Sequence, residues 1–373
     1  MKITILQGAF LPVPSCRGGA IEKAWFALGK AFTAQGHNVT HISRQCDGLP
    51  SEEFIGGVHH KRILGRNAVR NPYLLKLLEL PYIWRARKIL LPADIIVTNC
   101  FWAPMLFPSE KFGKIYVHVG RYPKGQLILY GKAKRLQVPS IGVAQAVEKE
   151  IKDKIGRVSV IPYPIPWEIE NLVPVRDRPK QLLYFGRIHP EKGVLSLIKA
   201  WKKINQDVTN GWKLRVIGPW RSDHGGGGLE YRNKIKNEIG EEESKIELLE
   251  PIFDTSQIKR EYQSARIFIY PSLAEKGETF GLSVLESMSM GCIPIVSELK
   301  CFNDIMPEDA SFIVPNSNHF ENSLRETIQT VIMKESKHQV FSTLAYEKSK
   351  KFTVEKVARK FLEDFKELNE SVQ

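Results

Sequence analysis

The stretch Glu278-Thr-Phe-Gly-Leu-Ser-Val-Leu-Glu286 places a glycine at the start of an apolar helical pattern, with a carboxylate at each end. It follows an apolar run, residues 267–270, and a polar loop, so we expect a strand, a loop and a helix that begins at Gly281. The amide groups of Gly281, Leu282 and Ser283 would form an anion site that a ligand approaches closely. Glu286 in so apolar a helix needs hydrogen-bond donors, and a ribose diol offers two. Both carboxylates also fit an ordinary helix, in which the first complements the helix dipole and the second is solvated.

Short apolar runs alternate with helical patterns on both sides of this stretch, which is typical of parallel sheets covered by helices. In the C-terminal half we expect strands at 181–185, 213–217, 245–249, 267–270 and 293–296, and helices that begin near 191, 229, 255 and 281. In the N-terminal half we expect strands at 2–7, 38–43, 94–99, 114–119 and 140–144, and helices near 20–35, 72–90 and 146–154.

A proline-rich segment separates the two halves. Residues 161–166 read Ile-Pro-Tyr-Pro-Ile-Pro, and further prolines follow, which prevents regular structure there. The length of 373 residues also suits two domains. We therefore expect an α/β protein with two Rossmann-like domains, 1–166 and 167–353, whose parallel sheets face an interdomain cleft where ligands bind.

A second motif, Tyr184-Phe-Gly-Arg-Ile-His-Pro-Glu-Lys-Gly193, also joins a strand to a helix. Gly186 lies at the turn, and Arg187 and Lys192 follow at the carboxyl end of the sheet. Two cations in this position clamp a diphosphate and stabilise it as a leaving group. The alternative is that both are surface cations of a loop.

Two weaker motifs lie in the N-terminal half. Gly18 and Gly19 open the first helix, where their amides approach a diphosphate or simply form a turn. His118 ends a buried-looking strand, where it is either a core residue or a contact to the transferred sugar and the acceptor. The run of glycines at 225–228 fits a phosphate loop, but a flexible connection is the simpler interpretation.

The charge of the chain is unevenly distributed. Residues 1–166 hold 24 basic and 10 acidic residues, whereas the remainder holds 30 and 31, so the excess of +13 resides in the N-terminal half. Residues 59–90 combine cations, among them Arg85, Arg87 and Lys88, with aromatic and aliphatic residues. This pattern indicates contact with an anionic partner such as a membrane surface or a phosphorylated lipid, or it serves solubility.

Several classes of protein are excluded by what the sequence lacks. The five cysteines are scattered without a C-x-x-C pair, which favours a reduced, cytoplasmic protein without a structural zinc site. We find no signal peptide and no membrane-spanning stretch. No G-x-G-x-x-G, no Walker motif and no nucleic-acid-binding pattern occurs, so we expect no nucleic-acid partner.

Together these motifs resemble the family 4 retaining glycosyltransferases of the GT-B fold. The resemblance covers nearly the whole chain and is firmest from 181 to 314. It depends on the E-x7-E element, the Gly186-Arg187 and Lys192-Gly193 pairs, His118 and the Gly18-Gly19 loop, in that structural context.

The resemblance implies a role for each motif. Catalytic residues would be His118, Arg187, Lys192 and Glu278. Donor-binding residues would be Gly18, Gly19, Gly186, Arg187, Lys192, Gly218, Ile252, Glu278, Phe280, Gly281, Leu282, Ser283 and Glu286. The base would lie near Gly218 and Ile252, and a C-terminal helix, about 354–373, would return to the N-terminal, acceptor-binding domain. No metal and no cofactor would be required, because cations and a helix N-terminus neutralise the donor phosphates.

We therefore expect a retaining hexosyltransferase that moves a sugar from a nucleotide sugar, with UDP-glucose favoured, to a lipid-diphosphate-linked or polysaccharide acceptor. Arg85, Arg87 and Lys88 would contact a membrane or the acceptor, at the inner face of the membrane. The alternatives are an inverting GT-B transferase and a nucleotide-sugar-modifying or NAD-dependent Rossmann enzyme.

Overall fold

The chain divides into two compact units in a computed structural model. Unit 1 comprises Met1–Trp167 and Phe352–Gln373, and unit 2 comprises Glu168–Lys351. The structure describes all residues except 16–18, 70, 153–154, 242–244 and 371–373. Within the described residues, no helix has both the length and the apolar character that a membrane span requires.

Unit 1 is built on an eight-stranded sheet with the order β3-β4-β2-β1-β5-β6-β7-β8. All neighbouring strands are parallel except the β3–β4 hairpin at one edge. The strands are β1 (Lys2–Leu6), β2 (Asn38–Arg44), β3 (Glu52–Ile55), β4 (Val58–Ile63), β5 (Ile95–Thr98), β6 (Lys114–His118), β7 (Arg135–Val138) and β8 (Val158–Val160). The helices are α1 (Ala20–Ala34), α2 (Pro72–Ile89), α3 (Ala103–Leu106), α4 (Ser109–Phe112), α5 (Ile141–Ile151) and α12 (Val354–Glu370).

One predicted strand of unit 1 is wrong. Residues 140–144 begin helix α5, with Ser140 as its N-cap, whose hydroxyl accepts a hydrogen bond from the amide of Val143. The strand lies earlier, at β7. A short apolar run does not distinguish a strand from the buried stripe of a helix, and here Val143, Val147 and Ile151 form such a stripe. The helix predicted at 146–154 is the end of α5, and its last two residues lie outside the described part of the chain.

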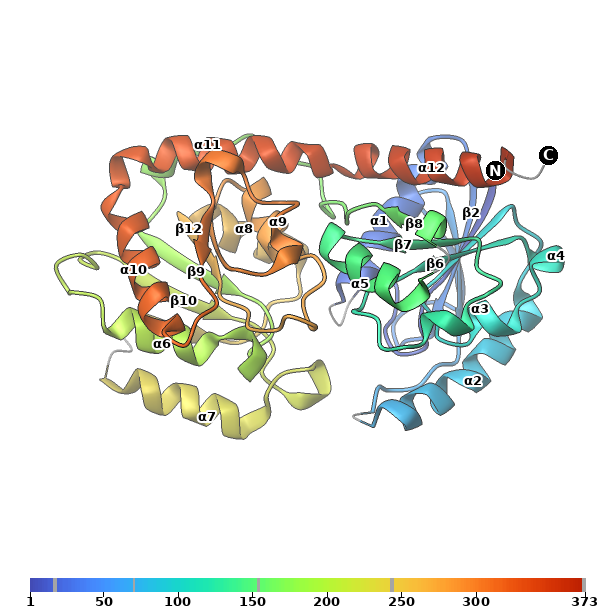
Figure 1. The fold of residues 1–373 in the computed structure, drawn as a ribbon, viewed down its shortest axis with the longest axis horizontal. Coiled ribbons are helices and arrows are strands. Elements are labelled where there is room, and N and C mark those ends of the chain that lie inside the picture. The colour runs from blue at the N-terminus through green and yellow to red at the C-terminus, as the bar shows by residue number, and fades with distance from the viewer. Residues whose placement is uncertain (16–18, 70, 153–154, 242–244, 371–373) are drawn as a thin grey trace. The chain divides into compact units, whose positions relative to one another are not determined.

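Helix α12 packs on the sheet of unit 1 beside α1, although more than 300 residues separate them (Figure 1). Phe361 lies 5.0 Å from Trp25, and Phe365 lies 5.8 Å from Phe32, measured between ring centroids. Its amphipathic spacing explains this docking, because one face is apolar and buried. The predicted C-terminal helix is therefore present and belongs to unit 1.

Unit 2 is built on a six-stranded parallel sheet with the order β11-β10-β9-β12-β13-β14. The strands are β9 (Gln181–Phe185), β10 (Lys213–Ile217), β11 (Ile246–Leu249), β12 (Ile267–Tyr270), β13 (Ile293–Ser297) and β14 (Phe312–Val314). The helices are α6 (Val194–Lys202), α7 (Gly228–Ile239), α8 (Thr255–Ser264), α9 (Leu282–Ser289), α10 (Phe320–Met333) and α11 (His338–Ser349). The five strands predicted for this half are present, so the expected α/β fold with two mostly parallel sheets is confirmed.

Candidate functional site

The centre of the candidate site is an ion pair between two predicted residues of unit 2. Lys192 ends the short helix η4 (Pro190–Lys192) that follows β9, and Glu278 lies in the loop that follows β12. The two strands are neighbours and parallel, so both segments leave the same edge of the sheet. The Lys192 Nζ atom lies 2.6 Å from Glu278 Oε2, and both side chains are largely buried. The pair therefore places a cation and a carboxylate together at the carboxyl end of the sheet.

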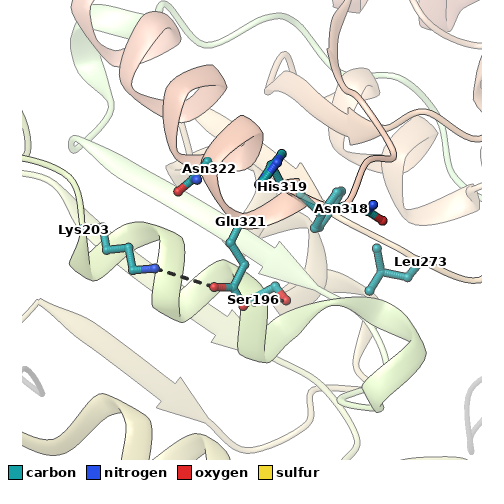
Figure 2. A pocket seen from close by; sticks show the side chains of 8 residues that line it. Ser196, Lys203, Leu273, Asn318, His319, Glu321 and Asn322 are labelled. Carbon is teal, nitrogen blue, oxygen red and sulfur yellow. Dashed lines mark hydrogen bonds and ion pairs between the residues drawn. The ribbon is translucent and has the colours of Figure 1, made fainter.

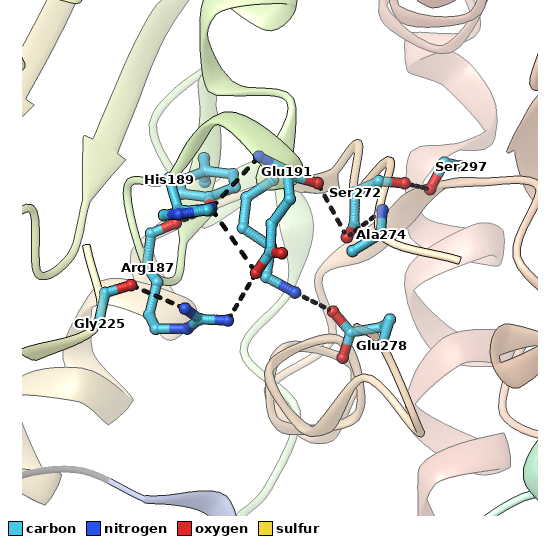
Figure 3. A network of polar contacts seen from close by, with 10 residues as sticks. Arg187, His189, Glu191, Gly225, Ser272, Ala274, Glu278 and Ser297 are labelled. Atoms are coloured by element: carbon cyan, nitrogen blue, oxygen red, sulfur yellow. Dashed lines mark hydrogen bonds and ion pairs between the residues drawn. The ribbon is translucent and has the colours of Figure 1, made fainter. Parts of the chain in front are cut away.

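Arg187 belongs to the same polar network, shown in Figure 3. Its Nη2 atom donates to Glu191 Oε1 at 2.8 Å, and its Nη1 atom donates to the carbonyl of Gly225 at 2.7 Å. The Tyr184 hydroxyl donates to the Arg187 carbonyl and fixes the backbone of the turn. The Arg187 side chain is nevertheless 41% exposed, so it is held in place and still accessible to a ligand.

Helix α9 begins at the same edge, four residues after Glu278. Its N-cap, Gly281, has a φ of 84°, and a Cβ atom there would lie 2.4 Å from the ring of Phe302. Both facts require glycine at this position. Because glycine has no side chain to cap the helix, the first amides depend on other partners, as in anion sites at helix N-termini.

Glu286 lies in the second turn of α9 and is 3% exposed. The Tyr262 hydroxyl donates to its Oε2 atom at 3.2 Å. The interpretation of Glu286 as a solvated surface residue is therefore wrong, because the carboxylate is buried in unit 2.

The ends of β9 and β10 approach each other closely where the base is expected. Gly218 has a φ of 154°, and a Cβ atom there would lie 1.8 Å from the carbonyl oxygen of Gly186. Ile252 follows β11, which is the neighbour of β10. Next to Gly218, the Trp220 indole donates to Glu250 Oε2 at 3.1 Å, and the Arg232 guanidinium lies 4.3 Å above the indole ring. The sequence analysis did not single out Trp220 or Arg232, although Trp220 directly follows Gly218 and Pro219.

Two predicted residues of unit 1, Gly19 and His118, follow or end strands at the carboxyl end of its sheet. Gly19 is the N-cap of α1 with a φ of 114°, and a Cβ atom there would lie 2.2 Å from Glu22 Oε2. Gly18 lies outside the described residues. Glu22 itself was not predicted; it is buried, and burial raises its pKa to about 7.

His118 ends β6, is 3% exposed and has both ring nitrogens hydrogen-bonded within unit 1. Gln137 donates from Nε2 to the carbonyl of Ile161, so its Oε1 atom accepts from His118 Nδ1. His118 Nε2 then accepts from the Tyr163 hydroxyl at 2.9 Å. Burial lowers the pKa of His118 to about 4, so the imidazole is neutral at physiological pH. This placement fits a satisfied core histidine, and its catalytic role stays a prediction.

The predicted cations Arg85, Arg87 and Lys88 lie near the end of α2. Arg85 donates to the carbonyl of Leu64, and Arg87 lies 5.6 Å from the ring of Trp84. They are thus a surface feature of unit 1.

A separate pocket of about 340 Å³ lies in unit 2 between α6 and the start of α10 (Figure 2). Glu321 lies in it and pairs with Lys203 at 3.8 Å. None of the predicted site residues lines this pocket. Among the described residues, no three His, Cys, Asp or Glu side chains gather as a metal site.

Residues 167–348, nearly all of unit 2, match the family described as "Glycosyl transferases group 1". The chain is 26% identical over 188 residues to the lipopolysaccharide 1,2-N-acetylglucosaminetransferase of Salmonella typhimurium, which covers 50% of this chain and 48% of that protein. It spans 48% and 24% of the length of the two curated relatives that it matches.

Two solved structures are similar over almost the whole chain. Sucrose-phosphate synthase from Thermosynechococcus elongatus has a TM-score of 0.80 at 20% identity, with 100% of both chains covered. HepE from Anabaena in complex with UDP-glucose has a TM-score of 0.71 at 16% identity, with 98% of this chain and 100% of that chain covered.

The two sheets and these structural neighbours show that the chain has the GT-B fold. The match to the glycosyltransferase group 1 family covers residues 167–348, just under half of the chain, so this similarity is shown for unit 2. This similarity supports the expectation of a sugar-transferring enzyme.

Proposed function

We propose that the chain transfers a hexose from a nucleotide sugar to a glycan acceptor, retains the anomeric configuration and uses no metal ion. The observation that carries this proposal is the network of Arg187, Lys192 and Glu278 at the carboxyl edge of the unit 2 sheet. This edge is where ligands bind in open α/β sheets, and the network combines cations for a diphosphate with a carboxylate for hydroxyl groups. The proposed division of roles is donor binding by unit 2 and acceptor binding by unit 1.

The donor would occupy unit 2 from the base to the sugar. The base lies near Gly218 and Ile252, and Glu286 accepts from the ribose hydroxyls. Arg187 and Lys192 hold the diphosphate. Gly186 allows close approach of the backbone, and the amides of Phe280, Gly281, Leu282 and Ser283 contact phosphate and sugar.

UDP-glucose is the favoured donor. A structure of the same fold, HepE from Anabaena, was solved in complex with UDP-glucose. Glu278 would accept hydrogen bonds from the hexose hydroxyls while Lys192 holds its carboxylate in place. For unit 1 we propose that Gly18, Gly19 and His118 contact the diphosphate, the transferred sugar or the acceptor.

The chemical step is the departure of the nucleoside diphosphate from the anomeric carbon. Negative charge grows on the leaving oxygen, and the guanidinium of Arg187 and the ammonium of Lys192 stabilise it. The acceptor oxygen bonds to the anomeric carbon on the face that the diphosphate leaves, which preserves the configuration, and the leaving phosphate accepts the acceptor's proton. These two cations supply the positive charge that a divalent ion otherwise provides.

We further propose that the acceptor is lipid-linked and that unit 1 contacts an anionic membrane surface through α2. The inward face of this helix is formed by Tyr82, Ile83 and Ala86. Its outward face is also apolar, with Tyr73 77%, Leu77 58% and Trp84 55% exposed. An apolar outward face on a soluble unit needs a partner, and the neighbouring Arg85, Arg87 and Lys88 select one with negative charge.

A thermal-shift panel of UDP-, GDP- and ADP-sugars tests the proposed function. The expected result is stabilisation by one of the three, best by UDP-glucose, followed by slow hydrolysis of that donor. Product NMR then distinguishes the retaining transferase from an inverting one by the anomeric configuration. Stabilisation by NAD instead of any sugar nucleotide would favour the alternative Rossmann enzyme and overturn the proposal.

A further inference from the structure

The glycine run at 225–228 is a closed turn that packs against the candidate site. All four amides donate hydrogen bonds of 2.8–3.1 Å to backbone carbonyls: Gly225 to Ser222, Gly226 to Arg221, Gly227 to Ile188 and Gly228 to Trp220. A phosphate loop presents free amides to its ligand, so the run does not form one in this structure. The run is not a flexible connection either, because each of its four amides donates a hydrogen bond.

Close packing explains why glycine occupies these positions. A Cβ atom on Gly226 would lie 2.2 Å from the backbone of Trp220, and one on Gly227 would lie 2.9 Å from Tyr231. Gly225 has a φ of 77°, a conformation that side chains rarely adopt. The run is therefore required by the fold of the turn.

The turn touches the candidate site through Arg187. The Gly225 carbonyl accepts from Arg187 Nη1 at 2.7 Å, and a Cβ atom on Gly225 would lie 3.2 Å from Arg187 Cδ (Figure 3). The second partner of the guanidinium is Glu191, in an ion pair that is 41% and 34% exposed. The carbonyl and the carboxylate accept from different nitrogens of the guanidinium, so the two contacts together set its direction.

The contact leaves the guanidinium available to a ligand. An arginine has five N–H donors, and Gly225 and Glu191 accept from two different nitrogens. No third partner occurs among the residues that the structure describes. The remaining donors are free to bind phosphate oxygens.

We propose that the glycine turn is a positioning element, in which the Gly225 carbonyl aims Arg187 at the donor diphosphate. This inference depends on the proposed function, because it assigns the diphosphate to Arg187. It gives the turn a role in donor affinity that the sequence alone does not indicate.

The test is Gly225→Ala, with Gly211→Ala as the matched control. Gly211 has a φ of 74°, so the backbone strain is similar, but its Cβ atom would lie only near the Lys180 side chain at 3.8 Å. It precedes β10 and so lies at the opposite end of the sheet. Calorimetry with UDP should show a Kd about tenfold higher for Gly225→Ala, the effect of one charge-assisted hydrogen bond, and an unchanged Kd for the control.

A double-mutant cycle with Arg187→Ala separates positioning from a general structural effect. We expect Gly225→Ala to change the Kd for UDP no further once Arg187 is absent. An equal loss in both backgrounds, or an equal loss in the Gly211→Ala control, overturns this inference alone. If Arg187→Ala by itself leaves UDP binding unchanged, the donor site of the proposed function fails as well.

Discussion

The Nζ atom of Lys192 and the Oε2 atom of Glu278 lie 2.6 Å apart, although 86 positions separate the two residues in the chain. The pair is largely buried, whereas the neighbouring Arg187–Glu191 pair is partly exposed. A buried carboxylate without its cation is costly, so each partner holds the other in the site.

Lys192→Ala should lower turnover by about 100-fold or more, because one preorganised electrostatic contact to the leaving group is lost. Steady-state kinetics, with the donor that the thermal-shift panel identifies, measures the turnover of the variant and of the wild type. Lys199→Ala is the control, since Lys199 is 39% exposed and pairs with Glu321 in the separate pocket. Near-normal turnover of Lys192→Ala would count against the assigned site.

Glu286→Ala should also lower turnover by about 100-fold or more, because the buried carboxylate is expected to accept hydrogen bonds from the ribose. Glu286→Gln keeps the volume of the side chain and separates a folding defect from a binding defect. If Glu286→Gln folds with the wild-type Tm and keeps wild-type KM and kcat, the ribose contact is refuted.

Asp364→Ala should destabilise unit 1 by about 3–5 kcal/mol, the range for loss of one partner from a buried ion pair. Asp364 on α12 lies 2.8 Å from Arg135 and accepts from the Tyr116 hydroxyl at 2.6 Å. Urea unfolding measures the change. Glu363→Ala, on the same helix, should have little effect; if both variants unfold alike, α12 is not anchored by this pair.

Glu22 should make the stability of unit 1 depend on pH. Burial raises its pKa from 4.5 to about 7, so the folded state favours the protonated carboxyl. The resulting contribution to the free energy of unfolding is about 3 kcal/mol. It is fully present below the pKa of Glu22 in the unfolded chain and is lost as the pH rises to about 7. Glu22→Gln, which stays neutral, should therefore raise the Tm at about pH 8 and leave it unchanged at about pH 4. An equal shift at both values would show that titration is not the cause.

Reversal of Arg85, Arg87 and Lys88 to Glu should weaken binding to vesicles that contain phosphatidylglycerol by at least about tenfold, because each cation contributes about 1 kcal/mol near an anionic surface. Sedimentation with vesicles measures the fraction of protein that is bound. Reversal of Lys234, Lys236 and Lys337 in unit 2 is the control.

A second variant tests the apolar part of this surface. Leu77→Ser with Trp84→Ser should also reduce vesicle binding while Tm stays unchanged, because both side chains are exposed. If vesicle association is the same for all variants, the proposed membrane contact is wrong.

Local patterns predicted much of the fold. The alternation of strands and helices, the helix start at Gly281 and the amphipathic spacing of α12 are encoded within a few neighbouring residues. The wrong strand prediction at 140–144 has the same origin, since a short apolar run fits both the two-residue period of a strand and the 3.6-residue period of a helix. The hairpin of β3 and β4 was missed because it lies at the sheet edge and is only partly buried.

The residue types at the ends of the strands are predictable from the sequence, because the period of apolar residues and the positions of glycine are local properties. Which of these ends meet depends on the three-dimensional fold. The adjacency of β9 and β12 joins Lys192 to Glu278, burial removes Glu286 from solvent, and a glycine turn folds back onto Arg187. These contacts depend on strand order and close packing, which no short stretch of the chain specifies.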